Sequence, residues 1–255
     1  MYNLNILSMS STSETGHAKN VANFEKLLAE VKVLGKSYNP SRENLKLAAL
    51  DTQLTAAKTA ITTMNTSEST YKNAISARDA ALKSFGKLVT RINNALKASD
   101  TLVEQDEKAT ALVRKLQGRR ASAKKTEEEI KLAAEQGKEI VQVSASQMSF
   151  DNRIENFSKL INLISSIPAY SPNEPELKVA ALTSFYNDLK AKNLAVVNAE
   201  ASLNLARIAR NEALYKENIG LLDISVDVKN YIKSIFGANS PQYKNIGGFK
   251  FTSIN

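Results

Sequence analysis

The chain has 255 residues, of which 43% are hydrophobic and 24% charged, as in an ordinary globular protein, and its 9 glycines and 5 prolines are few for a fold rich in tight turns. It has no cysteine, which excludes disulfides, thiolate zinc sites, iron–sulfur clusters and cysteine nucleophiles. The net charge of +8 is spread thinly, with +5 in residues 1–100, +1 in 101–150 and +2 in 151–255, so charge alone does not predict a nucleic-acid surface.

An internal repeat organises the sequence. Residues 38–83 align without a gap with residues 170–215, and 14 of the 46 pairs are identical, several-fold more than composition alone would give. A weaker match pairs residues 112–118 with 231–237. We therefore predict an all-α fold, an elongated helical bundle with long coiled-coil-like helices, built from two tandem diverged copies of one helical unit. The expected organisation is a first unit over 1–149, a second over 150–237 and an arm over 238–255.

Each unit is expected to open with an amphipathic helix, over residues 16–34 and 150–166. Apolar residues spaced three, four and three apart place one face of each helix in the core, namely Val21, Phe24, Leu28 and Val31, and then Ile154, Phe157, Ile161 and Ile164. The next helix is predicted to begin at Pro40 or Pro172, with Asn39 or Ser171 as its N-cap. In the second unit Pro175 also allows a later start, at Glu174.

A long heptad seam follows in the first unit. From residue 47 to residue 96 the seam positions step three and four alternately without a slip, which predicts one long helix. A hairpin turning at residues 65–67 is the alternative. A third helix is expected from the possible N-cap Ser99-Asp100 to Gly118, with residues 221–235 as its counterpart in the second unit. An exposed linker over 118–126 and a further helix over 127–144 complete the first unit.

Two charged residues interrupt the seam, Glu68 and Arg78, and the repeat places Glu200 and Arg210 at the matching positions. Ten residues of helix separate the two charges of each copy by about 15 Å, too far to pair within one helix. We predict inter-unit polar pairs, Glu68 with Arg210 and Arg78 with Glu200, that fix the register of packing about a pseudo-twofold axis. An alternative that we weigh equally is that the seam is exposed to solvent around these charged residues, with the aliphatic parts of the arginine side chains lying along the surface.

The sequence offers no recognisable catalytic, cofactor-binding or metal-binding motif. His17 is the only histidine, so it is interpreted as a helix-start residue, and a di-iron carboxylate bundle is excluded. No glycine-rich phosphate loop occurs, and Glu127-Glu128-Glu129 is the typical charged start of a helix. We therefore expect no enzyme, no cofactor and no small-molecule substrate.

A basic cluster is the candidate contact for a polyanion. It consists of Arg114, Lys115, Arg119, Arg120, Lys124 and Lys125. Acidic residues flank it on both sides and no aromatic residue interleaves it to stack on bases, which favours a self-neutralising solvated face.

The last segment leaves the helical pattern after Gly237. Phe249 and Phe251 alternate with Lys250 and Thr252, as in an extended arm. Tyr243, Phe249 and Phe251 are the candidate partner-docking residues, and the arm is expected either to fold back on its own bundle, which is favoured, or to dock into a neighbouring subunit.

The favoured function is a non-enzymatic structural or protein-interaction role, with a protein partner or self-association. The alternatives are a membrane-acting protein of the pore-forming kind and a basic nucleic-acid-binding protein. The first residues do not read as a secretory signal, and no window approaches the roughly 18 apolar residues that span a bilayer, so a cytoplasmic protein is expected.

Overall fold

The computed structural model describes residues 16–119, 126–136 and 148–254. Within these ranges the regular structure is helical and no strand occurs, so the predicted all-α class is confirmed. The α-helices are α1 (His17–Val33), α2 (Leu47–Leu82), α3 (Phe85–Lys97), α4 (Val103–Leu116), α5 (Glu127–Glu135), α6 (Phe150–Ser165), α7 (Val179–Tyr215), α8 (Leu221–Phe236) and α9 (Pro241–Gly247). Three short 3₁₀ turns join them, η1 (Gly35–Ser37), η2 (Glu43–Leu45) and η3 (Pro175–Leu177). None of the helices in the described ranges is both long and apolar enough to cross a membrane.

The chain forms two compact units, and each unit draws on both halves of the sequence. Of the described residues, unit 1 comprises 16–70 and 200–254, and unit 2 comprises those between 71 and 199. The long helix α2 therefore begins in unit 1 and ends in unit 2, whereas α7 begins in unit 2 and ends in unit 1. Each long helix thus contributes one end to each compact unit, and the division into repeat units over 1–149 and 150–237 stays a prediction.

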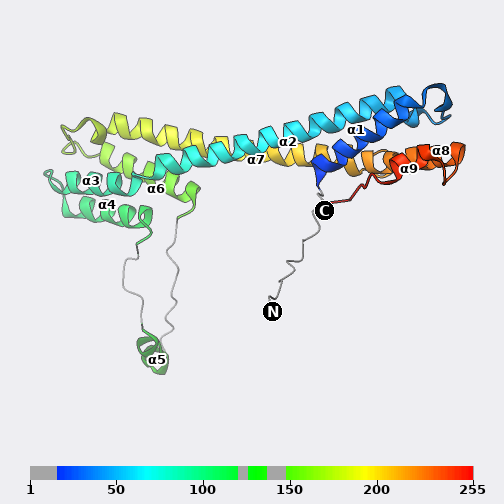
Figure 1. Cartoon of the computed structure of the whole chain (residues 1–255). Coiled ribbons are helices and arrows are strands. Elements are labelled where there is room, and N and C mark those ends of the chain that lie inside the picture. The colour runs from blue at the N-terminus through cyan, green and yellow to red at the C-terminus, as the bar shows by residue number, and fades with distance from the viewer. Residues whose placement is uncertain (1–15, 120–125, 137–147, 255) are drawn as a thin grey trace, which may run out of the picture. The chain divides into compact units, whose positions relative to one another are not determined.

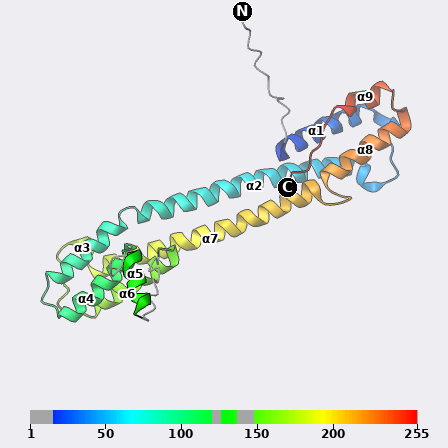
Figure 2. The same ribbon diagram turned by 90° about the horizontal axis from the view of Figure 1, so that it is seen from below.

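Unit 1 packs α1, the start of α2, the end of α7, α8 and α9 around one apolar core. Both ribbon views place α8 and α9 beside α1 (Figures 1 and 2). The fully buried core side chains come from every one of these helices and include Phe24, Leu27, Leu50, Ala57, Leu214, Leu221, Val228, Ile232 and Ile246.

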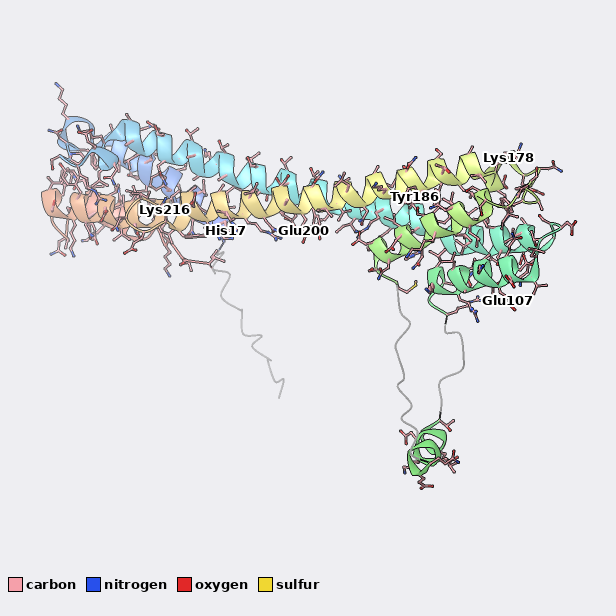
Figure 3. The ribbon with its side chains drawn as sticks, turned by 180° about the vertical axis from the view of Figure 1, so that it is seen from behind. His17, Glu107, Lys178, Tyr186, Glu200 and Lys216 are labelled. Atoms are coloured by element: carbon pink, nitrogen blue, oxygen red, sulfur yellow. The ribbon has the colours of Figure 1, made fainter. Side chains whose placement is uncertain are left out.

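Unit 2 packs α3, α4 and α6 with the end of α2 and the start of α7. Its core holds Phe85 and Phe157, and the partly buried Phe185 packs against them. The ring centroids lie 5.0 Å apart for Phe85 and Phe157, 5.9 Å for Phe157 and Phe185, and 6.1 Å for Phe85 and Phe185. Lys178 and Tyr186 mark the start of α7 in this unit, and Glu107 lies on α4 (Figure 3). Edge-to-face contact of the first two pairs adds to the stabilisation from burial alone.

The predicted opening helices are confirmed. The helix expected over 16–34 is α1, and the helix expected over 150–166 is α6, whose first turn is capped by Ser149 accepting from the backbone amide of Asn152 at 3.3 Å. Each buries the phenylalanine that its apolar spacing placed on the core face, Phe24 or Phe157.

The predicted starts of the long helices at Pro40 and Pro172 are wrong. In both places the chain first forms a 3₁₀ turn, and the α-helix starts later, at Leu47 or Val179. Tyr38 Oη donates to the Leu45 carbonyl at 2.8 Å, and Tyr170 Oη donates to the Leu177 carbonyl at 2.9 Å. Each hydroxyl satisfies the last carbonyl of its 3₁₀ turn. Asn39 and Ser171 do not act as N-caps, because both lie well before the first residue of the following α-helix.

The predicted long helix is confirmed through residue 65, and the hairpin alternative is wrong, because α2 continues without interruption from Leu47 to Leu82. The predicted extension to residue 96 is also wrong, since a turn at Lys83 and Ser84 separates α2 from α3. Phe85 is the third residue after Leu82, so the break leaves the three-and-four spacing of apolar residues unchanged. Spacing alone therefore could not reveal it.

The remaining helices of the first half differ from prediction at their ends. α4 begins at Val103 rather than directly after Asp100, with Leu102 at the N-cap and the Thr101 hydroxyl bonded to the Asp106 carboxylate at 2.9 Å. α5 begins at Glu127 as predicted and ends at Glu135. The rest of that predicted helix falls outside the described residues, apart from Gln136, which lies in a turn.

Candidate functional site

Residues 249–254 form an extended segment, which we call the strap, that lies along α1 in unit 1 (Figure 1). Phe249 and Phe251 are partly buried while Lys250 and Thr252 are exposed, as the alternation in the sequence predicts. The strap folds back on its own bundle, the favoured expectation. Tyr243 is not part of it, because residues 241–247 form α9, where an irregular arm was predicted.

Two asparagines of α1 hold the strap by its backbone. Asn20 Nδ2 donates to the Thr252 carbonyl at 2.7 Å, and Asn20 Oδ1 accepts from the Thr252 amide at 3.0 Å. Asn23 Nδ2 donates to the Lys250 carbonyl at 2.7 Å. One carboxamide thus satisfies both backbone groups of a single strap residue, and the next satisfies the carbonyl two residues earlier, on the same edge of the extended chain.

The other wall of this groove comes from α8. Lys229 Nζ donates to the Phe249 carbonyl and lies 5.3 Å from the centre of the Phe251 ring. Burial lowers the pKa of the Lys229 ammonium below its ordinary value. Both strap phenylalanines pack against the core of unit 1. We call this surface, formed by Asn20, Asn23 and Lys229 with the adjoining core, the strap groove.

The asparagines stand on the face of α1 that is otherwise apolar. Asn20 is 2% exposed and Asn23 is 7% exposed, beside the buried Val21, Phe24 and Leu27. A buried amide without a partner destabilises a protein by about 1–3 kcal/mol, and the strap backbone removes that penalty. The buried polar groups on this face of α1 are therefore fully hydrogen-bonded only when an extended chain lies against it.

His17 borders the strap groove at the start of α1. Its Nδ1 lies 2.5 Å from Tyr215 Oη at the end of α7, and Asn20 Nδ2 lies 3.4 Å from the same hydroxyl. Figure 3 shows His17 beside the end of α7, close to Lys216. Burial, and secondarily the charge of Arg210, lower the pKa of His17 below 6.5, while burial raises the pKa of Tyr215.

The contacts of His17 predict that the protein is less stable in mild acid than at neutral pH. Because the pKa of His17 is lowered in the folded state, the unfolded chain binds more protons than the folded chain just below pH 6.5. The contribution of His17 to the free energy of unfolding is therefore complete above pH 6.5 and is lost as the pH falls from there through the lowered pKa. We expect the free energy of unfolding, measured with urea, to fall between pH 7.5 and pH 5.5, and to fall less in His17→Gln. The imidazole resonance, the only one in the chain, should titrate below 6.5. Equal pH dependence of the two proteins would contradict the assignment.

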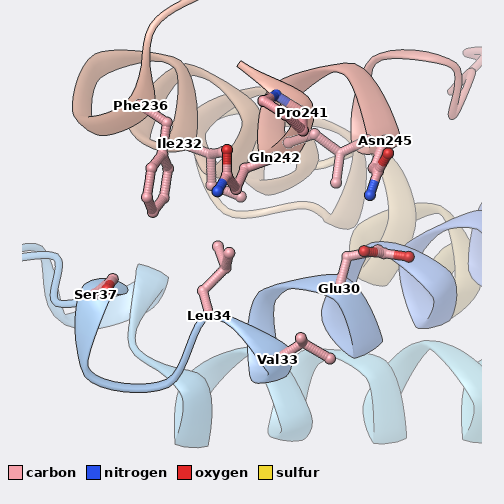
Figure 4. A pocket seen from close by; sticks show the side chains of 10 residues that line it. Glu30, Val33, Leu34, Ser37, Ile232, Phe236, Pro241, Gln242 and Asn245 are labelled. Atoms are coloured by element: carbon pink, nitrogen blue, oxygen red, sulfur yellow. The ribbon is translucent and has the colours of Figure 1, made fainter.

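A pocket of about 390 Å³ lies between the end of α1, the end of α8 and α9 (Figure 4). Leu34 points toward Ile232 and Phe236 across it, and Glu30 faces Asn245 at its edge. Its walls come from α9 as well as from the two helices that line the strap groove, α1 and α8. Polar and apolar side chains therefore share the lining of this pocket.

The two arginines of the predicted pairs, Arg78 and Arg210, make contacts within their own units. The Arg78 guanidinium lies 3.4 Å from the centre of the Phe150 ring and donates to Asn193 Oδ1 at 3.2 Å, and Asn193 in turn donates to Asp151 at 2.8 Å. These residues all belong to unit 2. In unit 1, Arg210 donates twice to the neighbouring Asn211 side chain, at 2.8 and 3.1 Å. The pairing of the arginines with Glu68 and Glu200 stays a prediction.

The basic cluster is only partly described. Arg114 and Lys115 lie in the last turn of α4 and Arg119 is exposed just after it, whereas Arg120, Lys124 and Lys125 fall outside the described residues. Arg114 lines a shallow surface pocket whose other charged residues are Lys97, Asp106 and Glu107. Charges of both signs share this surface.

No group of three or more histidine, aspartate or glutamate side chains in the described ranges is placed to hold a metal ion. Comparison of the chain with protein-family models, with curated proteins and with solved structures found no match.

Proposed function

We propose that the protein is a non-enzymatic, helical protein-interaction molecule whose strap groove binds an extended peptide segment. Proteins that take up extended peptides commonly bind the peptide backbone for affinity and bury alternate side chains for specificity. The strap groove has both elements, since Asn20 and Asn23 bind backbone groups and the adjoining core takes up alternate phenylalanines.

The observation that carries this proposal is the burial of the two asparagines. A helix that merely packed against α8 would place apolar side chains at positions 20 and 23, as it does at Phe24 and Leu27. Two amides that are almost fully buried and whose shortest hydrogen bonds, of 2.7 to 3.0 Å, go to backbone atoms of the strap fit a surface made to hold a chain in extended conformation. The strap of the same chain is its occupant in this structure.

The test uses the whole 255-residue chain with a weakened strap. In the double variant Phe249→Ala/Phe251→Ala the strap loses its buried side chains, and a labelled peptide of residues 248–255 should bind the vacated groove, as followed by fluorescence anisotropy. The intact protein should bind the peptide at least about tenfold more weakly, because its own strap competes at high effective concentration.

Two controls make the test decisive. Adding Asn20→Ala to the double variant should weaken peptide binding by about tenfold, the equivalent of one lost bidentate contact of about 1.4 kcal/mol. A peptide with alanine at both phenylalanine positions should not compete. Absence of peptide binding by the double variant, with helical circular dichroism unchanged, would refute the proposed function.

We further infer that the chain arose by duplication and that its two copies exchange parts. Each compact unit joins the opening helix and the start of the long helix from one copy to the end of the long helix from the other copy. α3 follows α2 in unit 2 as α8 follows α7 in unit 1. The buried positions of α3, at residues 85, 89, 92 and 96, correspond at a constant offset to 221, 225, 228 and 232 of α8. If this correspondence holds, α8 is the counterpart of α3, and not of α4 as the weaker match of residues 112–118 with 231–237 suggested.

The burial along α7 supports a coiled-coil-like seam. Leu182, Leu189, Val196 and Leu203 are buried at intervals of seven residues. This is the spacing expected when a helix packs lengthwise against partners on one side.

The duplication predicts equal effects of two matched substitutions. Tyr38→Phe and Tyr170→Phe each remove the hydroxyl that satisfies the carbonyl of Leu45 or Leu177, and burial raises the pKa of both phenols, that of Tyr170 to about 12. Each variant should lose about 1–3 kcal/mol of unfolding free energy in urea, since a buried acceptor is left unpaired. Tyr186→Phe is the control, because none of the hydrogen bonds described for the protein involves its hydroxyl. A loss in only one of the two variants would contradict equivalence.

A further inference from the structure

Two glycines, Gly247 and Gly248, join α9 to the strap, and the folded conformation requires glycine at neither. Gly247 is helical, and Gly248 has φ −73° and ψ −14°, which any residue adopts. A Cβ atom at either position would meet nothing within 4 Å. Alanine favours this helical conformation over glycine by a factor of roughly two to five at each position. The pair therefore weakens the closed form of this joint and favours its opening.

The bonds that hold the strap can be made equally well by the strap of another molecule. The backbone bond described near its start, from the Phe249 amide to the Ile246 carbonyl at 3.2 Å, belongs to the joint itself. The hydrogen bonds described beyond the joint run to side chains of α1 and α8, namely Asn20, Asn23 and Lys229. Opening the joint thus gives up one local bond and leaves the groove contacts available to a strap from elsewhere.

We propose that two copies of this chain exchange straps, each inserting residues 249–254 into the strap groove of the other, with Gly247 and Gly248 as the hinge. The inference rests on the proposed function and names the partner for that groove. The strap is the occupant whose fit the structure demonstrates, and a second copy supplies the same segment. Exchange of an identical element restores every groove contact in the dimer, so only the local backbone bond given up at each joint and the loss of independent motion oppose it.

The experiment measures self-association of the 255-residue chain by sedimentation across a concentration series. Wild type should form a dimer whose fraction rises with concentration, and Phe249→Ala/Phe251→Ala should stay monomeric. Gly247→Ala/Gly248→Ala should dimerise at least about tenfold more weakly, because four stiffened glycines per dimer favour the closed joint. Gly86→Ala is the matched control, since Gly86 also lies in a helix with open space around its Cα, and it should dimerise like wild type.

Three results would overturn the exchange: a wild-type chain that is monomeric throughout, a dimer that survives loss of both strap phenylalanines, or equal dimerisation of the hinge variant and Gly86→Ala. The peptide experiment separates this failure from that of the proposed function. If the strap-weakened variant binds the 248–255 peptide while wild type stays monomeric, the groove binds peptides and the second copy is not its partner. If the peptide does not bind, the groove itself is refuted.

Discussion

Replacing Phe157 with alanine should lower the free energy of unfolding by about 3–5 kcal/mol, the usual loss when a large aromatic side chain is removed from a packed core. Phe157 is fully buried, and its ring meets Phe85 edge to face at 5.0 Å and an interplanar angle of 86°. Phe185 completes the cluster. The deletion therefore leaves a cavity bordered by two rings that backbone shifts cannot readily close.

The measurement is urea unfolding followed by circular dichroism, with Leu205→Ala as the matched control. Leu205 lies on α7 with 68% of its surface exposed, so its truncation should change the free energy by less than about 0.5 kcal/mol. A loss below about 1 kcal/mol in Phe157→Ala would show that the three rings do not form a packed core. Hydrogen exchange in the same variant should locate the weakening in α3, α4 and α6, the helices that share this cluster.

The opening helices could be predicted from the sequence because their information is local. In α6 the residues Ile154, Phe157, Ile161 and Ile164 return to one face every turn, and that spacing alone fixes the helix and its buried side. The same reasoning placed α1 within one residue at each end. Only the immediate neighbours along the chain are needed for such a prediction.

The end of α2 could not be predicted in this way. Neither glycine nor proline marks Lys83 and Ser84, and the apolar phase passes through them unchanged into α3. By contrast, α9 carried a readable signal that the irregular-arm prediction overlooked. Ser240 followed by Pro241 is a typical N-cap and first helical residue, and the Ser240 hydroxyl accepts from the Tyr243 amide at 3.2 Å.

The extended strap could be predicted from the sequence, but the groove that holds it could not. The alternation of Phe249 and Phe251 indicated the extended strap, but its partners on α1 lie about 230 residues away in the sequence. Asn20 and Asn23 offered one local hint, since they stand three residues apart beside Val21 and Phe24, where a core helix normally carries apolar side chains. Which backbone would satisfy them depends on tertiary packing, and no periodicity contains that information.

The continuity of α2 makes a second prediction with a large effect. Asn65→Pro should lower the free energy of unfolding by about 3 kcal/mol or more, because proline removes one helical hydrogen bond and its ring clashes with the preceding turn. Asn65 is exposed near the middle of a helix of 36 residues, so no loss of side-chain packing contributes. Asn65→Ala is the matched control and should be neutral or slightly stabilising, since alanine is the better helix former.

The same pair of variants decides between the two arrangements that the sequence left open. In a hairpin turning at residues 65–67, proline would occupy a turn, where it is tolerated, and the two variants would unfold at similar urea concentrations. In the continuous helix they differ widely. A break in α2 would destabilise both compact units, because the first half of α2 packs in the core of unit 1 and its last residues pack in unit 2. A break at residue 65 should therefore reduce protection from hydrogen exchange on both sides of it, in α1 and in α3.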